Sequence, residues 1–247
     1  MLKIIRKIRQ ELLLENKFSK YLIYAVGEII LVVLGILIAL QINNINEESK
    51  DRGKEKIILE TLLADLKTNK ELIDQGFMDY DLSLNRSEAM ANHFGRELYK
   101  KDLVLFDSII YWSAEYIAIE LLETSISSLA TSGRLELLQK EALKQQIVRY
   151  PTYIELYKER ENVVRSIVIN EIRPNIEKHI SMQKWWNIPE SFTSDYAQLI
   201  NNREISNNYL NNLFQTRDAI SRLEKLKTAN EVLLRAIQIE LEDRFNL

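Results

Sequence analysis

The sequence contains no cysteine and little proline or glycine. Its 247 residues include no Cys, three Pro and six Gly. Without Cys the chain can form no disulfide, no thiolate nucleophile and no Cys-based metal site. All-β folds and long loops are disfavoured, because their turns depend on Pro and Gly. The abundance of Leu, Ile, Glu and Lys favours an all-α fold instead.

Residues that carry catalysis or bind metals are also scarce. The two His, His93 and His179, each lack a second ligand at metal-binding spacing. The sequence has no glycine-rich phosphate loop, no Gly-x-Ser-x-Gly motif and no Glu-x-x-His motif. We therefore predict that the protein is not an enzyme, that it uses no cofactor and that it has no metal site.

The charge is unevenly distributed along the chain. The formal net charge is −3, yet residues 1–20 contain six Lys or Arg against two Glu. The remainder of the chain is therefore mildly acidic. Because an acidic domain repels the phosphate backbone, we expect no nucleic acid as a partner.

One long apolar stretch lies at residues 21–40 (YLIYAVGEIILVVLGILIAL). A helix rises about 1.5 Å per residue, so such a stretch covers the ~30 Å hydrocarbon core of a bilayer. No second stretch of this kind exists, and the Leu-Gln-Ile-Asn that follows offers no small-x-small cleavage site. The sequence therefore predicts a single-pass protein with an uncleaved transmembrane signal anchor over residues 21–42.

Residues 1–20 are predicted to form a basic amphipathic helix at the cytoplasmic surface of the membrane. Apolar side chains recur there at helical spacing, and cations on the opposite side would meet anionic lipid headgroups. These membrane-surface cations are Lys3, Arg6, Lys7 and Arg9. The alternative is a frayed basic leader that only sets the orientation. Both interpretations place the N-terminus in the cytoplasm and the C-terminal domain in the periplasm, since Lys and Arg concentrate on the cytoplasmic side. We expect an inner-membrane location, with membrane lipids as partners.

Glu28 is the single charged residue within the span. At about 100° per residue, Gly35 and Ala39 lie within about 20° of its direction. Small residues four apart let two helices approach closely in lipid, and a carboxylate that faces lipid is costly. We therefore predict that Glu28, Gly35 and Ala39 form an intramembrane contact of a homo-oligomer. In the alternative, Glu28 lies near the inner headgroups and the true span is shifted towards Ile29–Ile42.

The N-terminal residues resemble a known family. The run KFSKYLIYAVGEIILVVLGILIALQINN, preceded by IRKIRQELLLENK, is similar to the start of an uncharacterised single-span membrane protein family of Bacteroidota. That family has a basic leader, a GEIxLVVxGILIALQINN-type span and a helical domain of unknown function. A looser similarity extends through SISSLATSGRLELLQKEALKQQIVRY. The resemblance implies an envelope protein of a Gram-negative-type cell and implies no activity. One difference is Ile45, where the family pattern has a Trp that would anchor the span.

Beyond a charged connector at residues 43–56, helical periodicity dominates residues 57–247. Apolar residues recur at helical spacing along two long segments, 137–173 and 204–242. We expect these to pack with a helix at 54–75 into an extracytoplasmic, antiparallel helical bundle.

Shorter helices are expected between the long ones. The helix that starts near residue 54 is expected to end near Gly76, and a later helix is expected over 107–122. Thr124 or Ser125 resembles the N-cap of a short helix that closes at Gly133.

Two residues interrupt the pattern of the segment 137–173. Pro151 is expected to kink the helix or to begin a new one, because proline lacks the N–H that the helix needs. Glu161 is the one polar residue on an otherwise apolar ladder between Leu143 and Val168.

The adjacent Trp185 and Trp186 are the last candidate site. If exposed, they would form a patch that recognises a partner protein or a glycan. If buried, they would plug the end of the bundle.

The sequence is compatible with three functions. The first is a structural or interaction protein of the cell envelope that self-associates through its span and bundle and binds an envelope partner. The second is an oligomeric sensor or channel-like assembly, with Glu28 facing the protomer interface or a pore. The third, an enzyme acting on envelope components, is the least supported because no catalytic constellation is present.

Overall fold

The computed structural model describes residues 18–186 and 188–245. The chain divides into two compact units, Met1–Glu55 and Lys56–Leu247. In the described residues all regular secondary structure is helical and no strand occurs. The predicted all-α class is therefore confirmed.

The described part of the first unit belongs to α2 (Phe18–Ala91). The large apolar side chains between Leu22 and Ile45 are all exposed, with 47% to 71% of their surface accessible. Among the described helices, α2 alone is long and apolar enough to cross a membrane. One long apolar helix near the N-terminus is therefore present, while the bounds of the span at 21–42 stay a prediction. Residues 43–56, expected as a connector, are helical as part of α2.

The second unit contains the remainder of α2 and, among the described residues, ten further helical elements. In chain order these are η1 (Glu97–Lys101), α3 (Leu103–Ser113), α4 (Thr124–Thr131), η2 (Arg134–Leu137), α5 (Glu141–Ile167), η3 (Val168–Ile172), α6 (Arg173–Glu177), η4 (Met182–Trp186), α7 (Tyr196–Ile200) and α8 (Arg203–Phe245). Here η3 is a π-helical turn and the other η elements are 3₁₀ turns. The long helix predicted at 204–242 corresponds to α8.

In the second unit, α8 runs in the opposite direction to α2. Lys227 on α8 bonds Asp74 on α2 (2.6 Å), and Arg217, earlier on α8, bonds Glu88, later on α2 (2.8 Å). Hydrogen bonds from Lys227 and Lys70 hold the pKa of the Asp74 carboxyl below its ordinary value of 3.8. These polar pairs fix the register of the two helices.

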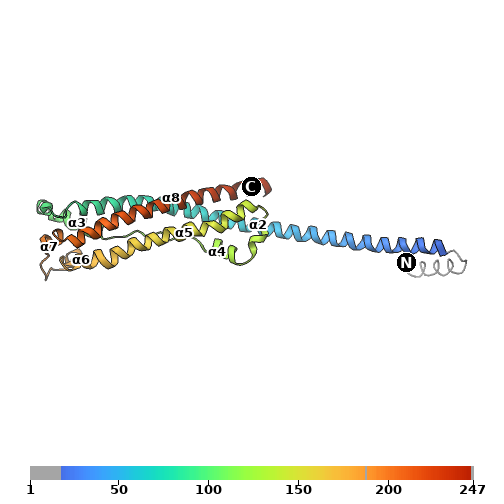
Figure 1. Ribbon diagram of the computed structural model, residues 1–247, viewed down its shortest axis with the longest axis horizontal. Helices are drawn as coiled ribbons and strands as arrows, with labels where there is room; N and C mark the ends of the chain where they lie inside the picture. The colour runs from blue at the N-terminus through green and yellow to red at the C-terminus, as the bar shows by residue number, and fades with distance from the viewer. Residues whose placement is uncertain (1–17, 187, 246–247) are drawn as a thin grey trace. The chain divides into compact units, whose positions relative to one another are not determined.

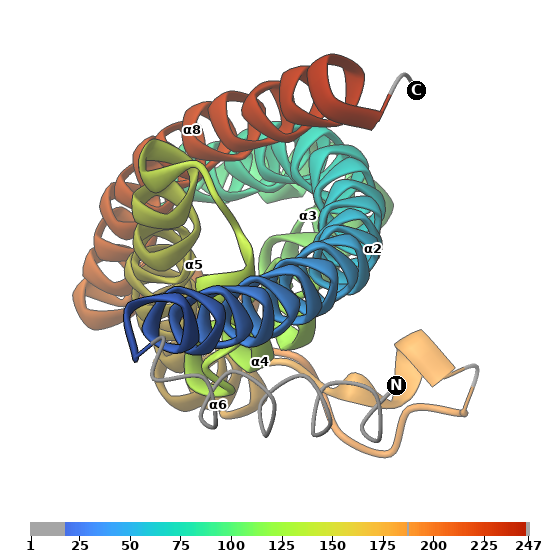
Figure 2. The ribbon, with the colours of Figure 1, turned by 90° about the vertical axis from the view of Figure 1, so that its right-hand side faces the viewer.

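By contrast, α5 runs in the same direction as α2. Tyr150 and Tyr157 on α5 bond Asn69 and Tyr80 on α2, so the residue numbers rise together. Figures 1 and 2 show α5 lying beside α8, and the two helices are in contact.

Two hydrophobic cores fill the second unit. The larger one joins α2, α5 and α8 and includes Leu66, Ile147 and Leu226, each with no exposed surface. The smaller one lies at the end remote from Lys56, where α3, α6 and α7 meet the beginning of α8 (Figure 1). Ile110 and Tyr209 are fully buried there.

The helix predicted over 107–122 is wrong at both ends. It begins at Leu103, where the Asp102 carboxylate accepts a hydrogen bond from the N–H of Leu105 (2.9 Å), and it ends at Ser113. The following residues up to Glu123 are not helical. They form a stretched connection, which we call the return segment (residues 114–123), because it leads back along the larger core to α4. Ile119 and Leu121 are buried in this core, whereas Ala118, Glu120 and Leu122 are exposed.

The helix α2 does not end near Gly76 as expected, and packing against the return segment accounts for the glycine. A Cβ atom at Gly76 would lie 2.1 Å from Cδ1 of Ile119. The Ile119 side chain occupies the space that a side chain at this position would need, so any larger residue would force Ile119 to move. The glycine therefore serves close packing rather than helix termination, and α2 continues to Ala91.

Two other helix boundaries also differ from those expected. The short helix before Gly133 exists as α4, but its N-cap is Glu123 rather than Thr124 or Ser125. The helix α5 continues through Pro151, so no new helix begins there. Its end is marked by the π-helical turn at Val168–Ile172.

We predict that Gly76→Leu destabilises the protein by about 1–3 kcal/mol, because the larger side chain overpacks the contact with Ile119. The matched control is Gly53→Leu, at a helical glycine where an added Cβ would have no other atom within 4 Å. This control is expected to be neutral or stabilising by up to about 1 kcal/mol, through helix propensity alone. Thermal unfolding of the detergent-solubilised chain measures both, and equal melting temperatures for the two variants would contradict the assigned role of Gly76.

Candidate functional site

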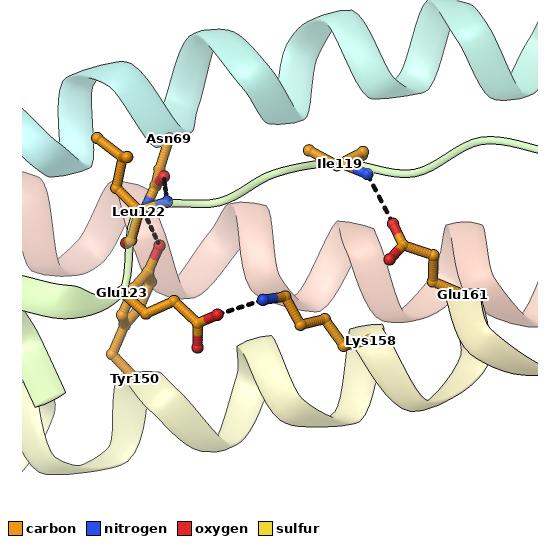
Figure 3. A network of polar contacts seen from close by, with 7 residues as sticks. All are labelled: Asn69, Ile119, Leu122, Glu123, Tyr150, Lys158 and Glu161. Carbon is orange, nitrogen blue, oxygen red and sulfur yellow. Dashed lines mark hydrogen bonds and ion pairs between the residues drawn. The ribbon is translucent and has the colours of Figure 1, made fainter.

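The most distinctive polar feature of the second unit is a set of buried side chains that hold the return segment. Figure 3 shows them on α2 and α5, on either side of the segment. They form two layers. The first lies near Leu122 and the second near Ile119, and each layer bonds main-chain groups of the segment.

In the first layer, the side-chain amide of Asn69 pairs with the backbone of Leu122. Its Nδ2 donates to the Leu122 carbonyl (2.9 Å), and its Oδ1 accepts from the Leu122 N–H (2.7 Å). Asn69 has no exposed surface. The amide therefore supplies the donor and the acceptor that a neighbouring strand would supply in a sheet.

The same layer continues across the core to α8. The Asn69 amide also donates to the Tyr150 hydroxyl (3.3 Å), which donates to Oδ1 of Asn230 (2.7 Å). The Asn230 amide in turn donates to the Leu66 carbonyl (3.0 Å). Burial raises the pKa of Tyr150 to about 12, so its hydroxyl keeps its proton at neutral pH. The layer thus ties α2, α5, α8 and the return segment together.

In the second layer, one carboxylate oxygen of Glu161 accepts two hydrogen bonds. One comes from the N–H of Ile119 (2.7 Å) and the other from the Tyr157 hydroxyl (2.8 Å). The Tyr157 hydroxyl also bonds that of Tyr80 (3.1 Å). Burial raises the pKa of both tyrosines, so both hydroxyls keep their protons. Tyr157 donates its single proton to Glu161, and Tyr80 is therefore the donor to Tyr157.

An ion pair between Glu123 and Lys158 closes the end of the return segment (Figure 3). Apart from the bond of Asn230 to the Leu66 carbonyl of α2, the groups of both layers bond one another or the segment backbone, so their chemical role is to position the segment. Among the described residues no group of three or more His, Asp or Glu is placed to hold a metal ion.

Sequence reasoning did not identify this network, although it contained the signal. Glu161 was the single polar residue on an apolar ladder, and Asn69 and Asn230 lie on the apolar faces of their own helices. A polar residue at a core position needs a buried partner. The partner was missed because it is main chain.

The residues predicted for the membrane lie in the first unit. Glu28, Gly35 and Ala39 are all exposed, and nothing lies within 4 Å of the position of a Cβ at Gly35. The predicted membrane-surface cations, Lys3, Arg6, Lys7 and Arg9, fall outside the described residues.

The two tryptophans have different environments. Trp185 is half-buried, packs against the smaller core and meets Tyr111 edge-on, with ring centroids 5.1 Å apart. Trp186 is 76% exposed. Near them, Trp112 lies edge-on to Tyr111 and is itself 45% exposed. One ring of the pair therefore packs and the other faces solvent, and recognition of a partner at Trp186 stays a prediction.

The two histidines have ordinary structural contacts. Nδ1 of His93 lies 2.8 Å from the Ala89 carbonyl, and its ring stacks on Phe106. The backbone carbonyl of His179 accepts from the N–H of Asp195 (2.7 Å).

We predict that removing either layer destabilises the second unit. Asn69→Leu leaves the N–H and C=O of Leu122 without their partner, at a total cost of about 1–3 kcal/mol because these groups are only partly buried. Glu161→Leu has a similar cost at Ile119 and Tyr157, whereas Glu161→Gln keeps the accepting oxygen and is expected to cost less than about 1 kcal/mol. Chemical denaturation monitored by circular dichroism measures these differences.

The matched control for Glu161 is Glu159→Leu, at an exposed position on α5. It is expected to change stability by no more than about 0.5 kcal/mol. If Glu161→Leu were as mild as this control, the carboxylate would not hold the segment.

Comparison with known proteins identifies a family and little else. No curated protein and no solved structure matches the chain. A family model does match, over residues 28–160, and its description is "Family of unknown function (DUF6090)". This match covers more than half of the 247 residues. The chain therefore belongs to the family of unknown function DUF6090.

Proposed function

We propose that this protein is a membrane-anchored interaction protein of the cell envelope, with a single span and an extracytoplasmic helical bundle. The observation that carries the proposal is the contrast between the two units. The apolar side chains of Leu22–Ile45 are uncovered, whereas apolar side chains of the second unit fill two cores. Uncovered apolar surface on this scale is costly in water and is satisfied by lipid.

The basic residues at the start of the chain support the orientation. Residues 1–20 carry six Lys or Arg, and such residues concentrate on the cytoplasmic side of a span. The proposal therefore places the N-terminus in the cytoplasm and the second unit in the periplasm, at the inner membrane.

The span itself supports self-association. Glu28 is an exposed carboxylate on the same helical stripe as Gly35 and Ala39. A carboxylate in the hydrocarbon region is costly unless it meets a polar partner or is neutral. A second copy of the same helix supplies such a partner, and the two small residues permit a close approach. The proposed contact is therefore a homo-oligomeric one.

The exposed aromatic end of the second unit supports a further protein partner. Trp186 and Phe192 are 76% and 73% exposed, close in sequence and next to the packed Trp185. Aromatic residues are enriched where proteins bind one another. We therefore propose that an envelope protein binds here.

The orientation is tested by reporters fused to the C-terminus. A reporter that is active only in the periplasm is expected to be active, and one that is active only in the cytoplasm is expected to be silent. The reverse pattern would refute the periplasmic placement while leaving the span in place.

Self-association is tested by the mass of the purified protein in mild detergent. Glu28→Leu and Gly35→Leu are each expected to weaken the oligomer by about 0.6–2 kcal/mol per contact. Glu28→Gln is expected to preserve it, because the amide still forms hydrogen bonds. The control is Leu37→Phe, which adds bulk at about 180° from Glu28 on the helix.

If the two Leu variants and the control have the same mass as the unmodified protein, the span is an anchor only. A conductance across a planar bilayer that Glu28→Gln abolishes would instead favour the channel-like assembly.

A further inference from the structure

A groove of about 460 Å³ runs between α5 and α8 in the second unit. Its lining includes Gln146, Arg149 and Tyr153 from α5, and Lys225, Thr228 and Val232 from α8. The volume lies within the range of pockets that bind small molecules, about 300–1,000 Å³. No residue of the groove belongs to the candidate patch at Trp185 and Trp186.

The groove carries uncompensated positive charge. Arg149 and Lys225 contribute from opposite helices, and no carboxylate is among the lining residues. Neither cation forms an ion pair with any residue that the structure describes. Two cations that converge on one groove without an acidic neighbour favour an anionic occupant.

The groove also contains an unsatisfied polar atom. Oε1 of Gln146 is buried and has no hydrogen-bond partner among the described residues. A buried amide atom without a partner costs about 1–3 kcal/mol. Because the oxygen and nitrogen of an amide are exchanged by a half-turn of the side chain, Gln146 can donate to an anion or accept from a neutral group.

Between these polar groups the walls are apolar. Tyr153 and Val232 are 37% and 51% exposed, and Ala229 and Leu233 lie beside Val232 on α8. The walls are therefore suited to a short hydrocarbon or aromatic body. An ion without such a body would leave them in water.

We propose that this groove is a binding site for a small amphiphilic carboxylate, a molecule with one carboxylate head and a short apolar body. Arg149 and Lys225 hold the head by charge, and Gln146 donates a hydrogen bond to it. Tyr153 and Val232 cover the body. The site does not depend on the orientation of the protein or on self-association.

The floor of the groove connects the site to the buried network. Tyr150 is one of the residues that line the groove, and its hydroxyl bonds Asn69 and Asn230 inside the core. An occupant therefore packs on a residue that holds the return segment. Binding is expected to raise the unfolding temperature of the second unit, because the ligand binds only the folded state.

The test uses the full chain in a non-ionic detergent and octanoate as the probe. Saturation-transfer NMR detects binding, and titration gives the dissociation constant. Octanamide and octylammonium are the matched probes, because they share the apolar body and enter micelles as octanoate does. Octanoate is expected to bind at least about tenfold more tightly than either.

The variants locate the site. The double variant Arg149→Gln with Lys225→Gln is expected to lose at least about tenfold in octanoate affinity, and Val232→Glu, which adds a negative charge at an exposed position, is expected to lose as much. Arg235→Gln is the control, because it removes one charge from an exposed position of α8 outside the groove. It is expected to leave the affinity unchanged.

Circular dichroism checks that each variant is folded. The two groove variants are both expected to weaken octanoate binding, one by removing positive charge and the other by adding negative charge. Equal binding of the three probes would overturn the proposal, as would octanoate binding that Arg235→Gln weakens as much as the groove variants do. Absence of octanoate binding up to about 10 mM, an affinity weaker than about −2.7 kcal/mol, would also overturn it.

Discussion

The second unit depends on one interaction, the pairing of the Asn69 side chain with the backbone of Leu122. A stretched chain that crosses a helical core has main-chain N–H and C=O groups without partners of its own. Each such group costs about 1–3 kcal/mol if it is buried and unsatisfied. Asn69 meets both groups of Leu122 with one amide, and Glu161 meets the N–H of Ile119. With these partners, the return segment can pack its Ile and Leu side chains in the core.

The return segment also decides the direction of the helices. Because the chain returns along the core in a stretched form, α5 can start near the beginning of the second unit and run parallel to α2. The spacing fits this arrangement. From Leu122 to Ile119 a stretched chain covers up to about 10 Å, and seven helical residues, from Asn69 to Gly76, also cover about 10 Å. The two contacts of the segment with α2 therefore match along their full separation.

The sequence was sufficient for the all-α class and for α8, whose apolar residues recur at helical spacing along most of its length. It was insufficient for residues 107–123. The sequence Tyr-Ile-Ala-Ile-Glu-Leu-Leu lacks Gly and Pro and is therefore compatible with a helix as well as with an extended chain. In the structure, Ile119 and Leu121 are buried and alternate with exposed neighbours, as in a strand. Local propensity cannot choose between these, since the choice depends on Asn69 and Glu161, which lie about 40 to 50 residues away. Gly76 was misread for the same reason, because its contact with Ile119 is tertiary.

The family match ends at residue 160, whereas the second compact unit extends to the end of the chain. The hydrophobic core depends on residues from both sides of residue 160. Residues 28–160 include most of the apolar stretch and of α2, the return segment and most of α5. They omit Glu161 and all of α8, which supplies Leu223, Leu226 and Leu233 to the larger core and Asn230 to the first polar layer. Without α8, the apolar faces of α2 and α5 would be exposed and Tyr150 would lose an acceptor. The matched region therefore includes the return segment and Asn69, whereas Glu161 and the helix that completes the larger core lie beyond residue 160.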